Sequence, residues 1–495
     1  MINAITLICP ILLPVILGVL PAIFKPLRQE RLQKAVVLAA LILNALFSAV
    51  VALRPGSSLT VVNLTEKLPI LLAADSVSRF FCAIVAVMYL LAGVFSLEYM
   101  KHENNRGRFY MSFLITLGML NGMGLAGNLM TLYLFFEALT LLSLPLVIHA
   151  MTKEAIAATF KYLFYSIAGS SLVLVGFFFV YNYSDSLAFS STGVLNMAKL
   201  NGNENAMLVA ALLAVIGFGA KAGMFPLHGW LPSAHPVAPA PASAILSGVI
   251  TKAGVLAIIR FIFFIVDMDF LEGTWVQTTL MILALISILM GSMLAYREPT
   301  LKKRLAYSSV SQVSYVLFGL FTLSVDGVTG GMLHIVTHSI VKSCLFLAAG
   351  AIAHKTGKTS VSDLRGIGKR MPVTLGCFTL ASITLVGIPP TSGFISKWTI
   401  ATGALSSNNG VFSWLGPAVL LLSALLTAGY LLPISISGFF PGEGFKRGVE
   451  RDTEQDITQG SSREGGPLML APMLILAALA ILAGFFSKQI IAFLS

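Results

Sequence analysis

Four charged residues interrupt segments that are otherwise apolar enough to cross a bilayer. Lys221, Lys252 and Lys397 lie in three of these segments, and Glu137 lies in an earlier one that reads MTLYLFFEALTLL. A charge at bilayer depth costs on the order of 3 kcal/mol even on a lenient insertion scale, so such residues indicate function by default. The pattern favours transfer of protons or ions through the membrane.

Glu137 has no other charge within one helical turn. Alone in hydrocarbon it would take its neutral, protonated form, but a lysine on a facing helix would let it ionise as a pair. A purely structural ion pair between two helices is the alternative. Because buried ion pairs often stabilise less than apolar residues of equal size, we favour the functional interpretation.

Lys221 and Lys397 each lie beside residues that interrupt helices. These residues are Gly217, Gly219, Pro226, Pro389 and Pro390. Main-chain groups freed by such a break are tolerated at membrane depth only inside protein or beside a wet cavity. A desolvated lysine at a break can accept and release a proton at physiological pH, unlike an exposed one. One broken helix in each half of the chain predicts an inverted-repeat transporter architecture.

A stripe of titratable residues follows on a later predicted helix. His334, His338 and Lys342 are spaced four residues apart, so they share one helical face. Lys252 lies among small residues that permit close helix packing. A lone buried histidine is usually an ordinary core residue, but three titratable groups on one membrane-helix face are typical of a proton relay.

Metal and cofactor ligands are sparse in the sequence. His228 and His235 lie in a proline-rich segment without acidic or thiol neighbours, so we favour a rigid turn over a metal site. The four cysteines are isolated, at Cys9, Cys82, Cys344 and Cys377. Without a Cys-x-x-Cys or Cys/His cluster, we expect neither a metal nor a redox cofactor in this chain.

The composition indicates a membrane protein. Of 495 residues, 57% are hydrophobic and only 11% are charged, against about a quarter charged in soluble domains. The net charge of +11 falls in short loops between apolar spans, so we interpret it as a topology signal and expect no nucleic-acid binding.

Windows of about 20 apolar residues predict an all-α, polytopic fold with about fourteen transmembrane helices. The predicted spans are 3–24, 33–53, 76–97, 109–126, 128–149, 157–182, 207–227, 242–266, 276–296, 305–324, 328–353, 372–401, 411–440 and 467–494. The first, third, ninth, eleventh and thirteenth loops carry clusters of Lys and Arg, whereas the even loops are neutral or acidic. The positive-inside rule then places both termini outside. The polar stretch 442–466 is expected to be a flexible surface loop rather than a docking surface.

Four segments resemble a known family. They are FFEALTLLSLPLVI, GFGAKAGMFPLHGWLPSAHPVAPAPASAILSGVITKAGV, LHIVTHSIVKSCLFLAAG and VGIPPTSGFISKW. They are similar to the antiporter-like subunits of respiratory complex I, membrane-bound group 4 hydrogenases and multisubunit cation/proton antiporters. The resemblance covers residues 75–440, and the second segment is long and specific.

This resemblance implies two inverted five-helix repeats, at helices 4–8 and 9–13, each forming a proton half-channel around a broken helix. The chain would divide into residues 1–108, 109–266, 276–440 and 441–495. Glu137 would tune the central lysine, Lys221. Lys252, His334, His338 and Lys342 would form the relay, and Lys397 the exit-side group.

The resemblance also implies partners. We expect a proton-translocating subunit of a redox-driven complex in the prokaryotic cell (inner) membrane, beside a second antiporter-like subunit, a redox module and lipid. Iron–sulfur clusters or other redox centres would lie in the partner subunits. A cation/proton antiporter without a redox partner is the alternative, and a structural scaffold whose charges only hold helices together is a third. The histidines of FPLHGWLPSAHP favour the redox-driven members.

Overall fold

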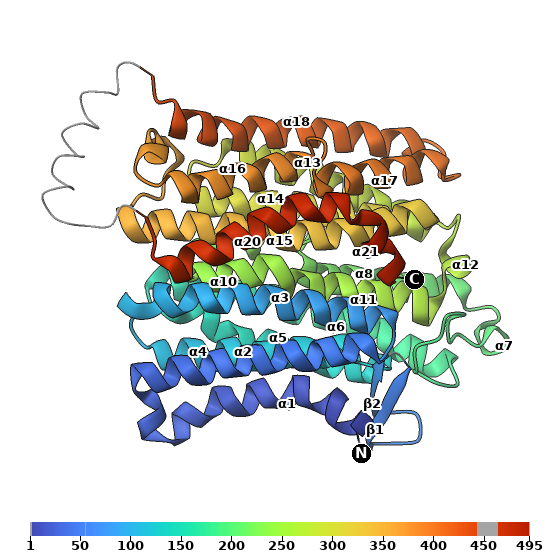
Figure 1. Cartoon of the computed structure of the whole chain (residues 1–495). Coiled ribbons are helices and arrows are strands. Elements are labelled where there is room, and N and C mark those ends of the chain that lie inside the picture. The colour runs from blue at the N-terminus through green and yellow to red at the C-terminus, as the bar shows by residue number, and fades with distance from the viewer. Residues whose placement is uncertain (1, 55, 443–463, 495) are drawn as a thin grey trace, which may run out of the picture.

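The computed structural model describes residues 2–54, 56–442 and 464–494, and most of them form long helices that lie side by side (Figure 1). The first half contains α1 (Ile2–Ile23), η1 (Lys25–Arg28), α2 (Glu30–Leu53), β1 (Ser57–Asn63), β2 (Pro69–Ala74), α3 (Ser76–Tyr99), η2 (Met100–His102), α4 (Arg106–Gly124), α5 (Leu129–Val147), η3 (Ile148–Ala150), α6 (Lys153–Tyr183), α7 (Met197–Leu200), α8 (Glu204–Ala222), α9 (Leu231–Val237), α10 (Ala240–Ile245), η4 (Leu246–Ile250), α11 (Thr251–Phe261) and η5 (Ile262–Val266). The second half contains α12 (Met268–Leu271), α13 (Trp275–Arg297), α14 (Leu301–Phe321), α15 (Val325–Thr356), η6 (Val361–Leu364), η7 (Ile367–Lys369), α16 (Pro372–Val386), α17 (Ser392–Ser406), α18 (Phe412–Phe439), α20 (Pro467–Phe485) and α21 (Ser487–Leu494).

Eleven helical segments among the described residues are long and apolar enough to cross a membrane. The chain is therefore an integral, multi-pass membrane protein, as predicted. The number fourteen stays a prediction, because α4 and α14 are more polar and the predicted span 372–401 is divided into α16 and α17. Most of the predicted polar stretch 442–466 lies outside the described residues.

Helix α15 lies at the centre of the bundle. It packs against α3, α10, α14, α16, α17 and α20, and 94% of its most apolar window is buried. By contrast, only 33% of the corresponding window of α2, at the edge of the bundle, is buried (Figure 1). The titratable stripe of α15 is thus enclosed by protein, whereas most of the surface of α2 is not covered by the rest of this chain.

A hairpin that the sequence did not predict fixes the start of α5. Strands β1 and β2 pair antiparallel between α2 and α3. Ala73 N donates to Leu125 O at 2.7 Å, and Gly127 N donates to Leu71 O at 2.8 Å, so the hairpin extends onto the α4–α5 connection. Asn128 then caps α5, because its Oδ1 accepts from Thr131 N at 2.8 Å.

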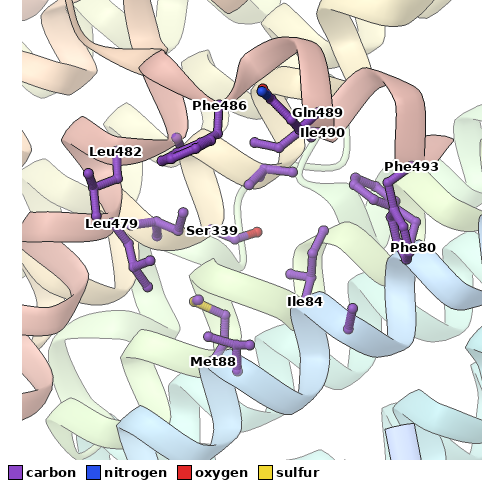
Figure 2. A pocket seen from close by; sticks show the side chains of 15 residues that line it. Phe80, Ile84, Met88, Ser339, Leu479, Leu482, Phe486, Gln489, Ile490 and Phe493 are labelled. Carbon is purple, nitrogen blue, oxygen red and sulfur yellow. The ribbon is translucent and has the colours of Figure 1, made fainter. Parts of the chain in front are cut away.

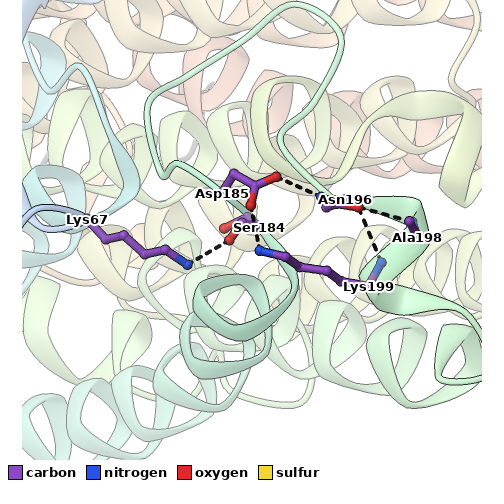
Figure 3. Close-up of polar contacts among 6 residues, drawn as sticks. All are labelled: Lys67, Ser184, Asp185, Asn196, Ala198 and Lys199. Carbon is purple, nitrogen blue, oxygen red and sulfur yellow. Dashed lines mark hydrogen bonds and ion pairs between the residues drawn. The ribbon is translucent and has the colours of Figure 1, made fainter.

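A polar cluster ties the connection after α6 to the hairpin turn (Figure 3). Lys67 donates to Ser184 O at 3.0 Å, and Lys199 lies 2.5 Å from an Asp185 oxygen. Asn196 donates to Asp185 at 2.7 Å and caps α7 through its side-chain oxygen. Hydrogen bonds from Lys199 and Asn196 hold the pKa of Asp185 below its usual range. Because this ion pair is exposed, it orders the loop and adds little stability.

Two helices are interrupted inside the bundle, and each interruption begins at a glycine. Gly223 (φ +85°) ends α8, and Gly387 (φ +92°) ends α16. Both conformations are left-handed, which only glycine adopts without strain. A Cβ at Gly223 would also lie 2.1 Å from the Leu231 side chain. The main-chain direction at both breaks therefore depends on these two glycines.

An ion pair links the start of α3 to α11. The guanidinium of Arg260 on α11 is fully buried and donates two hydrogen bonds to the Asp75 carboxylate, at 2.6 and 2.7 Å. Asp75 also caps α3 through Ser78 N, at 2.8 Å. The rings of Phe189 and Phe264 lie 4.8 and 5.0 Å from the guanidinium. This pair sets where α3 begins relative to α11.

We predict that Asp75→Asn destabilises the protein, because Arg260 stays buried and charged without its anion. Removing one partner of a fully buried pair costs about 3–5 kcal/mol, and the 40% exposure of the Asp75 side chain reduces the expected loss to about 2 kcal/mol. Thermal unfolding in detergent, followed by tryptophan fluorescence, measures the change. Asp326→Asn, at the start of α15, is the control for loss of a carboxylate, and an equal loss there would contradict the prediction.

The same pair predicts a pH dependence. Burial raises the pKa of the Asp75 carboxyl, but hydrogen bonds from Arg260 and Ser78 outweigh burial and lower it overall. A carboxyl whose pKa is lowered on folding contributes stability above its unfolded pKa, near 4, and loses it as the pH falls further. Unfolding temperatures of wild type and Asp75→Asn should therefore converge below about pH 4. A constant difference down to pH 2 would contradict this assignment.

Candidate functional site

Lys221 and Glu137 lie on adjacent helices but do not form an ion pair. Lys221, on the last turn of α8, is 1% exposed, and its Nζ donates to Thr140 Oγ1 at 2.6 Å. The Phe136 ring centroid lies 4.9 Å from the same Nζ. Thr140 and Phe136 flank Glu137 on α5, and one Glu137 oxygen is buried without a hydrogen-bond partner. The ammonium thus rests beside the turn of α5 that carries the carboxylate.

Of the residues predicted to interrupt α8, two lie within the helix and one lies in the interruption. Gly217 and Gly219 lie inside the helix, and Gly217 packs against the main chain of Gly169 on α6. The interruption itself begins at Gly223 and includes Pro226, which follows a cis peptide bond. Trp230 covers the end of α8 by donating its indole N–H to Ala220 O at 2.8 Å. Pro389 and Pro390, also joined by a cis bond, lie between α16 and α17.

Lys252 contacts His338 across the boundary between α11 and α15. Its Nζ is hydrogen-bonded to His338 Nδ1 and donates to Ser247 O in the π-helical turn η4. A π-helical turn departs from the regular hydrogen-bonding pattern and recurs at functional sites. When Lys252 carries its charge, the ammonium has no lone pair, so His338 Nδ1 is then the acceptor and the ring proton lies on Nε2. That Nε2 is buried without a partner.

The other members of the stripe point to different helices. Lys342 Nζ donates to Leu305 O at 2.9 Å and to the Ser308 hydroxyl, both on α14. His334 Nδ1 is 2.9 Å from Ser396 Oγ on α17. The His334 and His338 ring centroids lie 6.2 Å apart. One face of α15 therefore connects α11, α14 and α17, as helical spacing predicts for residues four apart.

Lys397 is held by the carbonyl end of the preceding helix. Its Nζ donates to Leu385 O at 2.6 Å and to Val386 O at 3.1 Å, in the last turn of α16. The centroid of the Tyr315 ring lies 4.9 Å from this Nζ. The same ring stacks on His334 with a centroid distance of 5.6 Å. The negative end of the helix dipole and the face of an aromatic ring both favour a cation here.

These contacts form a connected row from α11 to α17. It runs from Lys252 through His338, His334 and Tyr315 to Lys397. Lys221 is separate from it: helices α8 and α11 pack together, but no hydrogen bond joins Lys221 to Lys252 among the described residues. A hydrogen-bonded connection between these two lysines therefore requires water or a side-chain movement.

Several buried polar atoms beside the row have no hydrogen-bond partner. They are His334 Nε2, His338 Nε2, both amide atoms of Gln312 on α14, and both ring nitrogens of His235. Buried polar groups in proteins are nearly always hydrogen-bonded, and internal water supplies the partner where protein does not. These atoms are polar groups beside the row to which the described residues give no hydrogen bond.

Comparisons with known proteins identify the family. Residues 126–425 match the transmembrane family described as NADH:quinone oxidoreductase/Mrp antiporter, and residues 64–110 match the N-terminal family of complex I chain 5. The chain belongs to the NADH:quinone oxidoreductase/Mrp antiporter family. This confirms the resemblance found in the four sequence segments.

Three of the relatives illustrate different kinds of complex. The chain is 34% identical to the N subunit of the NADH-quinone oxidoreductase of Desulforudis audaxviator, over 85% of this chain and 83% of that protein. It is 32% identical to hydrogenase-4 component B of Escherichia coli, over 83% of this chain but only 62% of the component. It is 30% identical to a subunit of the Na⁺/H⁺ antiporter of Alkalihalophilus pseudofirmus, over 98% and 94% of the two chains.

Solved structures share the fold. A chain of the membrane-bound sulfane sulfur reductase, an archaeal respiratory membrane complex, superposes with a TM-score of 0.83 at 25% identity, over 100% of this chain and 96% of that one. A chain of the Mrp complex from Dietzia sp. gives 0.82 at 24% identity, over 99% and 96%. The helical membrane fold predicted from the sequence is thereby confirmed.

The sequence did not predict that Tyr315 is part of the row. Its hydroxyl donates to Leu420 O at 2.8 Å, which fixes the ring between Lys397 and His334. A signal was present, because α14 is unusually rich in hydroxyl groups for a membrane helix, at Ser308, Ser309, Ser311 and Ser314. Polar residues inside a membrane helix usually face the bundle interior.

An apolar groove lies beside the row (Figure 2). It encloses about 530 Å³ between α3, α15, α20 and α21 and is lined mainly by hydrocarbon, including Phe80, Met88, Leu482 and Phe486. Ser339 follows His338 on α15 and points its hydroxyl into the groove (Figure 2). The lining offers few hydrogen-bonding groups, in contrast to the polar row on the neighbouring face of α15.

The contact between Lys252 and His338 predicts energetic coupling. Contacting residues show interaction energies of about 0.5–3 kcal/mol in double-mutant cycles. We expect an interaction energy of at least about 1 kcal/mol between Lys252→Met and His338→Phe, because each substitution removes the buried partner of the other residue. Thermal unfolding of the four proteins measures it. Pairing Lys252→Met with His334→Phe is the matched control, and coupling that is no larger with His338 would contradict the contact.

Proposed function

We propose that this chain translocates protons as an antiporter-like subunit of a redox-driven membrane complex. The proposal rests on the row of buried ionisable groups from Lys252 to Lys397, beside which several polar atoms have no hydrogen-bond partner. A scaffold needs charges paired with opposite charges, but the lysines of this row bind neutral oxygens and rings. Neutral partners stabilise a cation without trapping it, which suits a site that must gain and lose a proton.

Lys221 and Glu137 are the proposed switch. Lys221 rests on Thr140 and Phe136, so the structure corresponds to a separated arrangement of the pair. When the carboxylate approaches, attraction in a low-dielectric interior favours the protonated lysine. When it withdraws, the ammonium is less stable and its proton passes through water to Lys252, then by the ring nitrogens of His338 and His334, and through water past the Tyr315 ring to Lys397. Lys342 forms a side branch of this path.

The proposed architecture comprises two inverted repeats, at residues 109–266 and 276–440, flanked by residues 1–108 and 441–495. The support is that each proposed repeat holds one interrupted helix whose break begins at a left-handed glycine. Both chain ends lie on the same side of the bundle (Figure 1), as an even number of crossings requires. With the basic loops in the cytoplasm, both termini face outward from a prokaryotic cell (inner) membrane.

The partners we propose supply the energy. Relatives include subunits of an NADH-quinone oxidoreductase and a hydrogenase, whose names imply electron transfer. Among the described residues of this chain, no group of three or more His, Cys, Asp or Glu side chains could hold a metal. We propose that iron–sulfur clusters or other redox centres lie in a partner module, with a second antiporter-like subunit beside this one.

The central test is Lys221→Ala in the complex purified with its native partners. We expect assembly to be unchanged and electron-driven proton uptake into vesicles, followed with a pH-sensitive dye, to fall at least tenfold, because the switch loses its cation. Lys355→Ala, at an exposed position near the end of α15, should pump normally. Normal pumping by Lys221→Ala would refute the switch, and a complex that does not assemble would support the scaffold alternative.

A second candidate is a cation/proton antiporter subunit without a redox partner. The match to the Na⁺/H⁺ antiporter of Alkalihalophilus pseudofirmus favours it, because it covers 98% of this chain and 94% of that protein. Under the leading proposal, vesicles with no electron donor show no sodium-dependent proton flux. A sodium gradient that alone drives proton movement, and loses this ability in Lys221→Ala, would establish the second candidate instead.

A further inference from the structure

A basic pocket lies at the end of the bundle where α1, α2 and α4 pack together. It has a volume of about 400 Å³. Three arginines line it, Arg28, Arg106 and Arg108, with Gln33 and Met111 between them. Nothing in the proposed transport mechanism uses these residues.

The arginines are fixed mostly by groups that leave their charge uncompensated. Arg28 donates to Pro21 O at 3.0 Å and to Ala22 O at 2.6 Å, at the end of α1. Arg108 donates to His149 O at 2.6 Å, and its Nε is buried without a partner. Carbonyl oxygens orient a guanidinium but carry no full charge. The pocket therefore presents rigid N–H donors that still lack an anion.

Glu30 does not line the pocket, but it contacts one of the pocket arginines and is shared between two cations. It lies 3.1 Å from Arg106 and 2.5 Å from Lys34. One carboxylate is thus set against four cationic side chains, Arg28, Lys34, Arg106 and Arg108. The net charge at this end of the bundle is therefore clearly positive. A doubly or singly charged phosphate group would balance it, and guanidinium groups bind phosphate through paired hydrogen bonds.

Helix α1, which lines the pocket with Pro21 and Ala22, also exposes a strip of apolar side chains. Along α1, Leu12, Ile16 and Ile23 are 49%, 54% and 66% exposed, and Phe24 is 54% exposed just before Arg28. Helix α1 is a membrane-spanning segment with much of its surface outside the bundle. A strip of exposed hydrocarbon thus leads along the membrane span to a pocket of positive charge, which matches the two parts of a phospholipid.

We propose that this pocket binds the phosphate of an anionic phospholipid whose acyl chain lies along the exposed face of α1. The phosphate contacts Arg28, Arg106 and Arg108, and the chain covers Ile23 and Ile16. A free phosphate ion would satisfy the arginines but not the strip, so the lipid is the ligand that uses both features. The site anchors the edge helices α1 and α2 to the basic, loop-bearing side of the membrane.

The test uses the full-length chain purified in detergent and phosphatidylglycerol as the probe, with retained lipid counted by native mass spectrometry. Arg28→Gln combined with Arg106→Gln should lower phosphatidylglycerol occupancy about tenfold relative to wild type. Lys25→Gln combined with Arg31→Gln removes the same number of charges at two exposed positions outside the pocket and should leave occupancy unchanged. Equal losses in both would overturn the proposal by showing non-specific attraction.

A second pair of variants leaves every arginine in place. Met111→Glu puts a negative charge into the pocket and should abolish binding, whereas Met111→Gln, of similar shape, should retain it. Phosphatidylcholine should bind at least tenfold more weakly than phosphatidylglycerol. Displacement of the lipid by millimolar inorganic phosphate would show a free-anion site and overturn the lipid assignment, as would unchanged binding in Met111→Glu.

Discussion

The structure depends on the cost of holding a charge where no water surrounds it. Four lysines, Lys221, Lys252, Lys342 and Lys397, are each no more than 9% exposed inside a bundle of membrane helices. Hydrocarbon offers no hydrogen bonds, so every ammonium must find its partners within the protein. The interruptions and packing of the surrounding helices follow from that requirement.

The protein supplies these partners in three ways. Hydroxyl groups serve Lys221 and Lys342, main-chain carbonyls at a π-helical turn and a helix end serve Lys252 and Lys397, and aromatic faces add to two of them. A carbonyl inside an unbroken α-helix already accepts one main-chain hydrogen bond, whereas carbonyls at an irregular turn or at the last turn of a helix are freer to accept from a cation. The departures from regular helix at η4 and at the end of α16 therefore supply the oxygens that the cations need.

Local signals explain which parts of the fold the sequence predicted. Apolar runs of sufficient length identified the membrane helices, and glycine with proline identified the regions of both breaks. The exact break at Gly223 was not foreseen, because Gly217 and Gly219 carry the same local signal and only packing shows that Gly217 lies against α6. The hairpin at residues 57–74 was missed because its stability comes from hydrogen bonds to the α4–α5 connection, distant in sequence.

The sequence by itself determined the membrane class, the family and which titratable residues lie at membrane depth, because the cost of a charge in an apolar span is a local property. Tertiary structure alone decided the partners. His338 meets Lys252, 86 residues away; Arg260 meets Asp75, 185 residues away; and Tyr315 lies between Lys397 and His334. Such pairings depend on how helices pack, and no local pattern specifies which faces of two distant helices will meet.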